Sequence, residues 1–458
     1  MPNAPELRIE PAGLSASEID QLFAPLKPFD RIALAVSGGS DSICLLRLFH
    51  DWHTRSGWSG ACEVLTVDHG LRLESVEETI FVQELSISLG YACSILRWSD
   101  GKPQTGVQEA ARQARYRLFA KHMSASGTEA LVLAHHKDDQ AETFLDRLTR
   151  GSGVFGLGAM SVDERGGAEG LRLLRPLLDV SKARLVESLK LRNQPWCEDP
   201  SNDSTKYKRS RLRKIAGLLA DEGFSQDRIL TTVRQMRRTR NALEFVLADT
   251  FTRLVEDHPA GPLRLAMDAF RKLPEEIRLR LLVLVIQRVT GKPYLPRLKK
   301  IEALDRNILS QKKVRQTFGG AVVERDDKHL CVWKEAGRSP PTTLVDVSGC
   351  GTWDDRFDFD VKPSNQKTSG CGVLMLGILR NAPVKQRDWP VLQGWPKEAF
   401  ASSPVFWCSN GILSIDSESA LFITGAVVEP FVIKLNRIPF PPNLAGNYID
   451  ILDAETKV

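Results

Sequence analysis

The segment at residues 31–52, RIALAVSGGSDSICLLRLFHDW, constrains the fold of this chain more than any other stretch. Its apolar start is typical of a buried strand, and the residues SGGSDS at positions 37–42 indicate a tight turn into a helix. Adjacent glycines let the backbone approach a ligand closely, and a helix start presents unpaired N–H groups to an anion. The segment therefore predicts a phosphate-binding turn between a strand and a helix.

An acidic residue occupies an unusual place in this turn. Common phosphate loops supply a lysine before Ser or Thr, whereas this chain has Asp41 there. A carboxylate beside a polyphosphate is favourable when Mg²⁺ lies between them. The alternative is a glycine-rich turn that binds no ligand.

The residues that follow predict a doubly wound parallel α/β sheet. Further apolar strands are expected at 61–69, 93–98 and 130–136, with helices at 71–89 and 107–123 between them. Asp68 and His69 end the second strand, and the ends of parallel strands are where such folds bind their ligands.

Two charged helices flank the predicted site. Asp139 and Glu142 follow the fourth strand and share one helix face, where they could hold Mg²⁺ or act as general base toward an amine. Ordinary capping by acids is the alternative reading. Arg112 and Arg115 share a face of the helix at 107–123, which suits phosphate binding but is equally typical of an amphipathic helix. The adjacent pair His135 and His136 would suggest zinc only if further spaced ligands were nearby, and none is.

The charge distribution indicates a nucleic-acid partner. Of the 458 residues, 42% are hydrophobic and 26% charged, and the net charge is only +5. Residues 201–240, however, hold eleven Lys and Arg against four Asp and Glu, and residues 297–315 hold seven against two. Such concentration is the electrostatic footprint of RNA binding, although solvated helix faces could produce it as well.

The same sequence bears on location. It contains no apolar run of membrane-spanning length and no signal-peptide pattern, so neither a membrane span nor secretion is expected. Its eight cysteines include no CxxC pair, which favours a reducing cytoplasm over a disulfide framework. The oligomeric state is left open, a homodimer included.

The turn SGGSDS between strand and helix resembles the signature of the N-type ATP pyrophosphatases, or PP-loop superfamily. Three further blocks in the same order resemble the tRNA(Ile)-lysidine synthetases within it: HHKDDQAETFLDRLTRGSGVFGLGAM, LLRPLLDVSKARL and WCEDPSNDSTKYKRSRLRK. With VDHGLR and AARQARYRLF, the resemblance covers about residues 30–215. One departure is Ser210, where the family pattern leads us to expect asparagine.

The resemblance implies a reaction. ATP would adenylate the C2 oxygen of the wobble cytidine in the CAU anticodon of tRNA(Ile), and L-lysine would displace AMP to give lysidine. Codon reading would change from AUG to AUA, and identity from Met to Ile. By position, the resemblance implies that the turn and Asp68 bind ATP and that Asp41 and Asp139 hold magnesium. It also implies a set of residues that act in catalysis or bind lysine, namely Asp41, Arg115, Asp139, Glu142 and Arg209. The turn residues are Ser37, Gly38, Gly39, Ser40, Asp41 and Ser42.

Four parts are expected along the chain: an N-terminal extension at 1–25, the PP-loop catalytic domain at 26–215, a helical tRNA-binding domain at 216–335 and a small β-rich domain at 345–458. The last would grip the tRNA outside its anticodon, or would be purely structural.

Three other functions remain to be weighed. A PP-loop tRNA thiolase would need a cysteine pair or cluster to deliver sulfur, and the chain has no CxxC. An amidotransferase-type synthetase would need a glutamine-hydrolysing nucleophile motif, which the sequence lacks. A silent RNA-binding module is disfavoured by the presence of Asp41, Asp139 and Glu142.

Overall fold

The computed structural model contains two compact units, of which the first extends to Ala242 and the second begins at Leu243. The structure describes residues 12–70, 74–99, 101, 103, 105–198, 211–212, 215, 218–220, 222–291, 297–337, 340–346, 349–363, 373–382, 386, 394–408, 411–413 and 431–437. The two units are considered separately.

A six-stranded sheet forms the centre of the first unit, with strand order β3-β2-β1-β4-β6-β5. All neighbours pair in parallel except β5 with β6. The predicted strands and the doubly wound α/β fold are confirmed, and the sequence reading missed the two short strands at the β5 edge. The strands are β1 (Arg31–Ala35), β2 (Ala61–Asp68), β3 (Ala92–Arg97), β4 (Ala130–Val132), β5 (Asp163–Glu164) and β6 (Leu173–Leu174).

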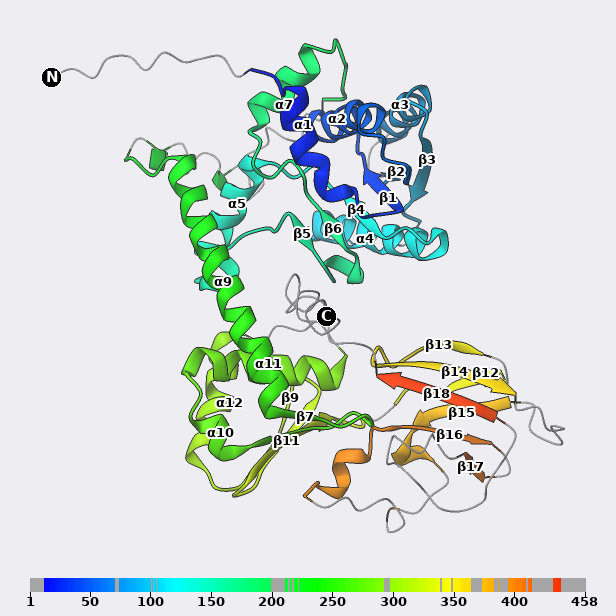
Figure 1. Cartoon of the computed structure of the whole chain (residues 1–458), viewed down its shortest axis with the longest axis vertical. Helices are drawn as coiled ribbons and strands as arrows, with labels where there is room; N and C mark the ends of the chain where they lie inside the picture. The colour runs from blue at the N-terminus through cyan, green and yellow to red at the C-terminus, as the bar shows by residue number, and fades with distance from the viewer. Residues whose placement is uncertain are drawn as a thin grey trace. The chain divides into compact units, whose positions relative to one another are not determined.

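Helices cover both faces of this sheet (Figure 1). The described helices of the first unit before α9 are α1 (Ala16–Phe23), η1 (Ala24–Leu26), α2 (Ser40–Ser56), α3 (Glu74–Ser88), α4 (Val107–Ser126), α5 (Lys137–Leu148), α6 (Val154–Leu157), η2 (Ala168–Gly170) and α7 (Lys182–Lys190). Successive residues of β1 point to opposite faces. Ile32 and Leu34 pack with α1, α2 and α7, and Ala33 packs with α4.

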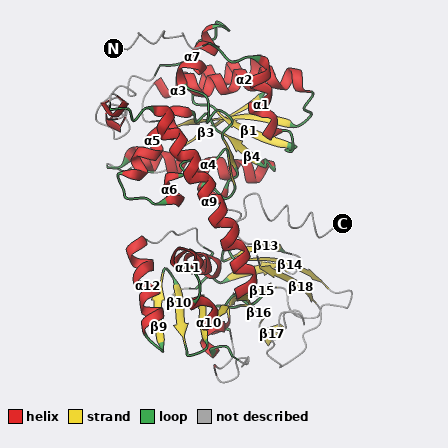
Figure 2. Cartoon of the chain, turned by 60° about the vertical axis from the view of Figure 1, so that its left-hand side comes forward, coloured by secondary structure: helices red, strands yellow, loops and turns green. Residues whose placement is uncertain are grey.

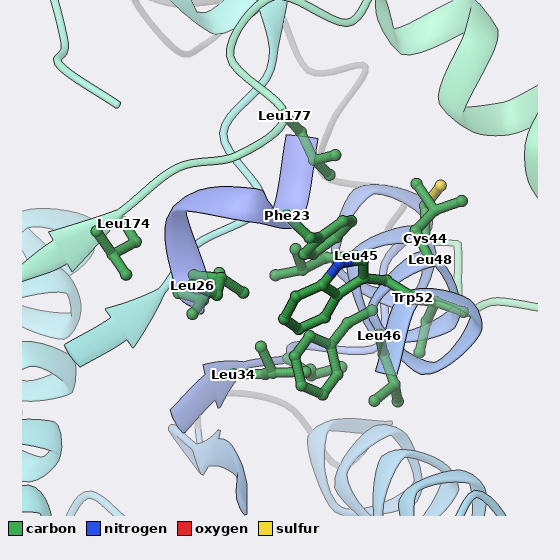
Figure 3. Close-up of a cluster of buried hydrophobic side chains, with 14 of the residues drawn as sticks. Phe23, Leu26, Leu34, Cys44, Leu45, Leu46, Leu48, Trp52, Leu174 and Leu177 are labelled. Atoms are coloured by element: carbon green, nitrogen blue, oxygen red, sulfur yellow. The ribbon is translucent and has the colours of Figure 1, made fainter. Parts of the chain in front are cut away.

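The core between α1, α2 and the sheet fixes where the predicted phosphate turn lies. Phe23, Phe49 and Trp52 are fully buried, with ring centroids 5.7 to 6.0 Å apart. Leu34 and Leu45 lie in the same cluster (Figure 3). Because β1 and α2 are both anchored in this core, the turn that joins them is held from both sides.

The second unit contains a five-stranded antiparallel sheet, of order β7-β8-β11-β10-β9, covered by helices. Its elements are α9 (Gln226–Leu254), which begins in the first unit, β7 (Val255–Asp257), β8 (Leu263–Ala266), α10 (Met267–Arg271), α11 (Glu275–Thr290), α12 (Leu298–Ser310), β9 (Val314–Phe318), β10 (Ala321–Arg325) and β11 (His329–Lys334). Helices α11 and α12 pack against this sheet through a shared apolar core (Figure 2).

The segment predicted as a helical domain therefore contains strands as well as the expected helices. Strand β10 alternates buried and partly exposed residues, which is the pattern of a sheet covered on one face. The strands of this sheet have three to six residues, so the helical periodicity of the segments around them dominates the sequence signal.

The remaining strands form two antiparallel sheets, of order β12-β15-β16-β17 and β13-β14-β18. They agree with the β-rich character predicted for the C-terminal part. Their bounds are β12 (Thr343–Asp346), β13 (Cys350–Trp353), β14 (Phe357–Pro363), β15 (Val373–Ile378), β16 (Pro404–Cys408), β17 (Gly411–Leu413) and β18 (Phe431–Arg437), with η4 (Leu379–Asn381) and η6 (Lys397–Phe400) between them. Among the described helices, none is long and apolar enough to cross a membrane.

Candidate active site

The turn between β1 and α2 is stabilised by its own side chains. The Ser37 N–H donates to Ser42 Oγ at 3.1 Å, and the Ser42 hydroxyl donates to the Gly39 carbonyl at 2.9 Å. Gly38 has φ +93°, and its carbonyl accepts the Cys197 N–H at 2.9 Å. Gly39 is the N-cap of α2 and has no side chain with which to cap the helix amides. The turn therefore has the geometry of an anion site.

Two of the predicted carboxylates meet at one imidazole. His136 Nε2 lies 3.4 Å from Asp41 Oδ2 and 3.5 Å from Asp139 Oδ2. His136 is the N-cap of α5, and its backbone N–H donates to Asp139 Oδ2 at 3.0 Å. The first turns of α2 and α5 thus bring together Asp41 and Asp139, which are far apart in the sequence.

The charges around His136 favour its protonated form. The ring is almost fully buried, which disfavours a charge. Hydrogen bonds to Asp138 and Asp41 and the charges of Asp139 and Asp41 outweigh burial and raise the pKa of His136 to about 10. The imidazole thereby neutralises part of a carboxylate cluster that would otherwise repel an anionic ligand.

A lysine completes this group. Lys182, the first residue of α7, places Nζ 3.5 Å from Asp41 Oδ2. Burial raises the pKa of Asp41, but His136 and Lys182 together lower it below its ordinary value. Asp138 also belongs to this region, since its Oδ2 accepts the Lys182 N–H at 2.9 Å and its Oδ1 accepts the Gln226 amide of α9.

A second group of predicted residues lies at the carboxyl end of β2. Asp68 Oδ1 accepts the Gly70 N–H and the Ser75 hydroxyl, both at 2.8 Å. Arg115 of α4 donates to His69 Nε2 from Nη2 at 2.9 Å and from Nε at 3.3 Å. Because Nε2 accepts these bonds, the neutral His69 ring carries its proton on Nδ1. Asp68 thus accepts hydrogen bonds from residues near it in the sequence, and Arg115 donates to His69, the residue after Asp68.

The other predicted residues have different environments. Glu142 is buried on α5 one turn after Asp139. Arg112 is exposed, and its guanidinium carbon lies 5.2 Å from the ring centre of Tyr116. Arg115, by contrast, contacts His69. Arg209 and Ser210 lie outside the described residues.

Four of the six arginines of α9 lie between residues 234 and 240, and they divide into two pairs. Arg237 Nη2 donates to the Met160 carbonyl at 2.7 Å, and Arg240 Nη2 donates to Ser161 Oγ at 2.8 Å. Arg234 and Arg238 are exposed to solvent. Part of the basic run therefore stabilises the loop after α6, whereas the exposed pair is accessible to a large anionic partner.

The carboxylates of Asp41 and Asp139 are more suitable for magnesium, which shares its ligands with substrate, than for a metal ion bound by protein side chains alone. In the described part of the chain, no group of three or more His, Cys, Asp and Glu residues is arranged as a metal site. Mg²⁺ is commonly bound by one or two carboxylates together with substrate phosphates and water. Asp41 and Asp139, converging beside the phosphate turn, are a donor set of that kind.

Comparison with known proteins identifies the family. A PP-loop domain model matches residues 12–217. The tRNA(Ile)-lysidine synthase of Wolbachia pipientis wMel is 35% identical over 360 residues, covering 78% of this chain and 82% of the relative. The enzymes of the same name from Bradyrhizobium diazoefficiens and Rhodopseudomonas palustris are 42% and 40% identical, covering 64% and 70% of this chain and 81% and 94% of the relatives. The chain belongs to the tRNA(Ile)-lysidine synthase family.

Membership in the tRNA(Ile)-lysidine synthase family confirms the predicted family, and its PP-loop domain makes this chain a user of ATP. The sequence did not predict His136, Asp138 and Lys182 as members of one cluster. A signal existed only for the first two, which stand at the start of the acidic helix. Lys182 comes from a separate block, and its place beside Asp41 depends on the packing of α7.

Proposed function

We propose that this chain joins L-lysine to C2 of the wobble cytidine in the CAU anticodon of tRNA(Ile), forming lysidine. The C2 oxygen attacks the α-phosphate of ATP and releases pyrophosphate. The lysine ε-amine then bonds to C2, and AMP departs with the oxygen. The observation that carries the proposal is the convergence of Asp41 and Asp139 beside the phosphate turn in a member of this family.

Magnesium fits this proposal through the chain's own carboxylates. Asp41 and Asp139 would hold the ion, which when bound supplies positive charge to the departing pyrophosphate. The turn residues from Ser37 to Ser42 bind the phosphates through backbone N–H groups at the start of α2 and the Ser37 hydroxyl. These groups stabilise negative charge where it accumulates.

The lysine nucleophile must lose a proton before it attacks. Its ε-ammonium has an ordinary pKa of about 10.4, so a carboxylate that accepts the proton accelerates the step. Glu142 and Asp139, one turn apart on α5, are the proposed acceptors. We assign Arg115 and Arg209 to the same reaction, where a guanidinium stabilises developing negative charge.

The tRNA partner is supported by the exposed arginines of α9, because phosphate contacts give affinity independent of sequence. The target base has to leave its stack to reach the cluster around His136, so a flipped cytidine is part of the proposal. Six cysteines, at positions 44, 62, 93, 197, 331 and 350, are free, which agrees with a cytoplasmic location.

The test is to incubate the protein with ATP, Mg²⁺, labelled lysine and a CAU-bearing tRNA(Ile) transcript, and to weigh the digested nucleosides. We expect a cytidine heavier by lysine less water, formed in step with AMP. Asp139→Asn and Glu142→Gln should each lower turnover by about 100-fold or more, since general acid–base groups contribute 10²- to 10⁴-fold. ATP binding without lysine in the RNA would refute the reaction, and full activity of both variants would refute the catalytic assignment.

A further inference from the structure

We propose that Lys182 binds the pyrophosphate portion of ATP and supplies the cation that the phosphate turn itself lacks. Its ammonium lies 3.5 Å from Asp41 Oδ2, and 45% of its side chain is exposed. It is therefore both close to the turn and accessible to a ligand from solvent. This inference rests on the proposed ATP site and adds a residue to it.

The chemistry of the turn creates the need for such a cation. In common phosphate loops a lysine within the loop reaches the terminal phosphates. Here Asp41 stands in that part of the turn, and a carboxylate alone would repel a triphosphate. Lys182 comes from α7, 141 residues later in the chain, yet it reaches the same carboxylate.

The backbone of Lys182 is fixed in place although its side chain is half exposed. Its N–H donates to Asp138 Oδ2 at 2.9 Å, and the preceding Val180 carbonyl accepts the Lys137 N–H at 2.9 Å. Farther along α7, Leu185 is fully buried, and its carbonyl accepts the Cys44 thiol of α2. The start of α7 is thus joined to α5 and its body to α2, the two helices that carry Asp139 and Asp41.

The other cations of α7 have partners elsewhere. Arg184 Nη2 donates to both Glu18 oxygens, at 2.9 and 3.0 Å. Lys190 Nζ lies 3.9 Å from Glu187 on the same helix. Of these three residues, Lys182 is the one whose side chain is directed at the phosphate turn. Lys190, 62% exposed, provides a matched control on the same helix.

The experiment measures equilibrium binding of ATP and of adenosine to the full chain by calorimetry. We expect Lys182→Ala to weaken ATP binding by about 10- to 100-fold, the range for one hydrogen bond to a charged group. Adenosine binding should be unchanged, Lys182→Arg should restore most of the ATP affinity, and Lys190→Ala should bind like the unaltered chain. Circular dichroism and thermal unfolding of each variant establish that it is folded.

A second experiment tests whether Lys182 binds the phosphates directly or only neutralises the charge of Asp41. In an Asp41→Asn background, Lys182→Ala should still weaken ATP binding, because the ammonium contacts the ligand directly. No effect in that background, unchanged ATP affinity of Lys182→Ala, or equal losses for ATP and adenosine would each overturn the inference. These measurements need no tRNA or lysine, so a failed lysidine assay would refute the proposed function without deciding the role of Lys182.

Discussion

At the scale of single residues, Gly38 shows why the turn requires glycine. Its φ of +93° lies in a region that side-chain-bearing residues rarely adopt. Space is not the obstacle, because an added Cβ would lie 3.4 Å from Cys197 Sγ, at ordinary contact distance. Its neighbour Gly39 has φ −70°, which any residue can adopt. Backbone conformation therefore distinguishes the two glycines.

We predict that Gly38→Ala destabilises the protein by about 1 to 3 kcal/mol, the cost of a strained backbone conformation, and weakens ATP binding. Gly39→Ala should leave the free energy of unfolding nearly unchanged. Thermal and denaturant unfolding of both variants test this. Equal stability losses at the two positions would contradict the role assigned to the φ of Gly38.

The positions of two predicted carboxylates could be inferred from their neighbours in the sequence, whereas their functions stay predictions. Asp41 follows the glycines, and Asp139 is predicted near the strand ends, because each stands in the first turn of a helix that comes after a strand. Nothing local indicates that His136 lies between them or that Lys182 joins them, since those contacts depend on how α5 and α7 pack on α2. The assigned roles of all the predicted site residues, Asp41 and Asp139 included, remain predictions.

At the scale of elements, the start of α1 is determined by residues close together in the sequence. Ser15 and Glu18, three residues apart, form a capping box, and Arg184 of α7 adds a salt bridge to Glu18. The hydrogen bonds from Ser15 and from Arg184 lower the pKa of Glu18 to about 2. The sheet of the second unit shows the opposite case, because its short strands lie among strongly periodic helices and were not predicted.

Glu18→Gln should lower the free energy of unfolding at pH 7 by about 0.5 kcal/mol, since the side chain is partly exposed and its interactions are screened. The pKa of Glu18 is lower in the folded chain than its ordinary 4.5, so its contribution is complete above pH 4.5 and is lost as the pH falls toward about 2. Denaturant unfolding of both proteins from pH 7 to pH 3 tests this. A stability difference that stays constant or grows with acid would contradict it.

At the scale of the whole molecule, the basic excess of the sequence has two uses. Arg237 and Arg240 bind the loop after α6, whereas Arg234 and Arg238 face solvent on the same helix. The composition of this segment indicates its excess of arginine and lysine, but not which of these residues bind the protein itself and which are free to bind a partner. The described structure makes that division.

We predict that Arg234→Ala and Arg238→Ala each reduce the slope of log K against log salt for tRNA binding by about 1, as expected for one lost phosphate contact. Arg55→Ala, at the end of α2 where it pairs with Asp20, should leave the slope unchanged. Titrations at several salt concentrations test this. An unchanged slope in both α9 variants would place the RNA elsewhere.

The hydrogen bonds from α9 to the loop after α6 also determine which residues a domain transferred to another protein must contain. The PP-loop domain model ends at residue 217, but the donors to Met160 and Ser161 are Arg237 and Arg240. A chimera joined at residue 217 would leave those acceptors without their guanidinium donors. A transferable PP-loop unit therefore includes the first half of α9, and fusion to another domain belongs after Ala242.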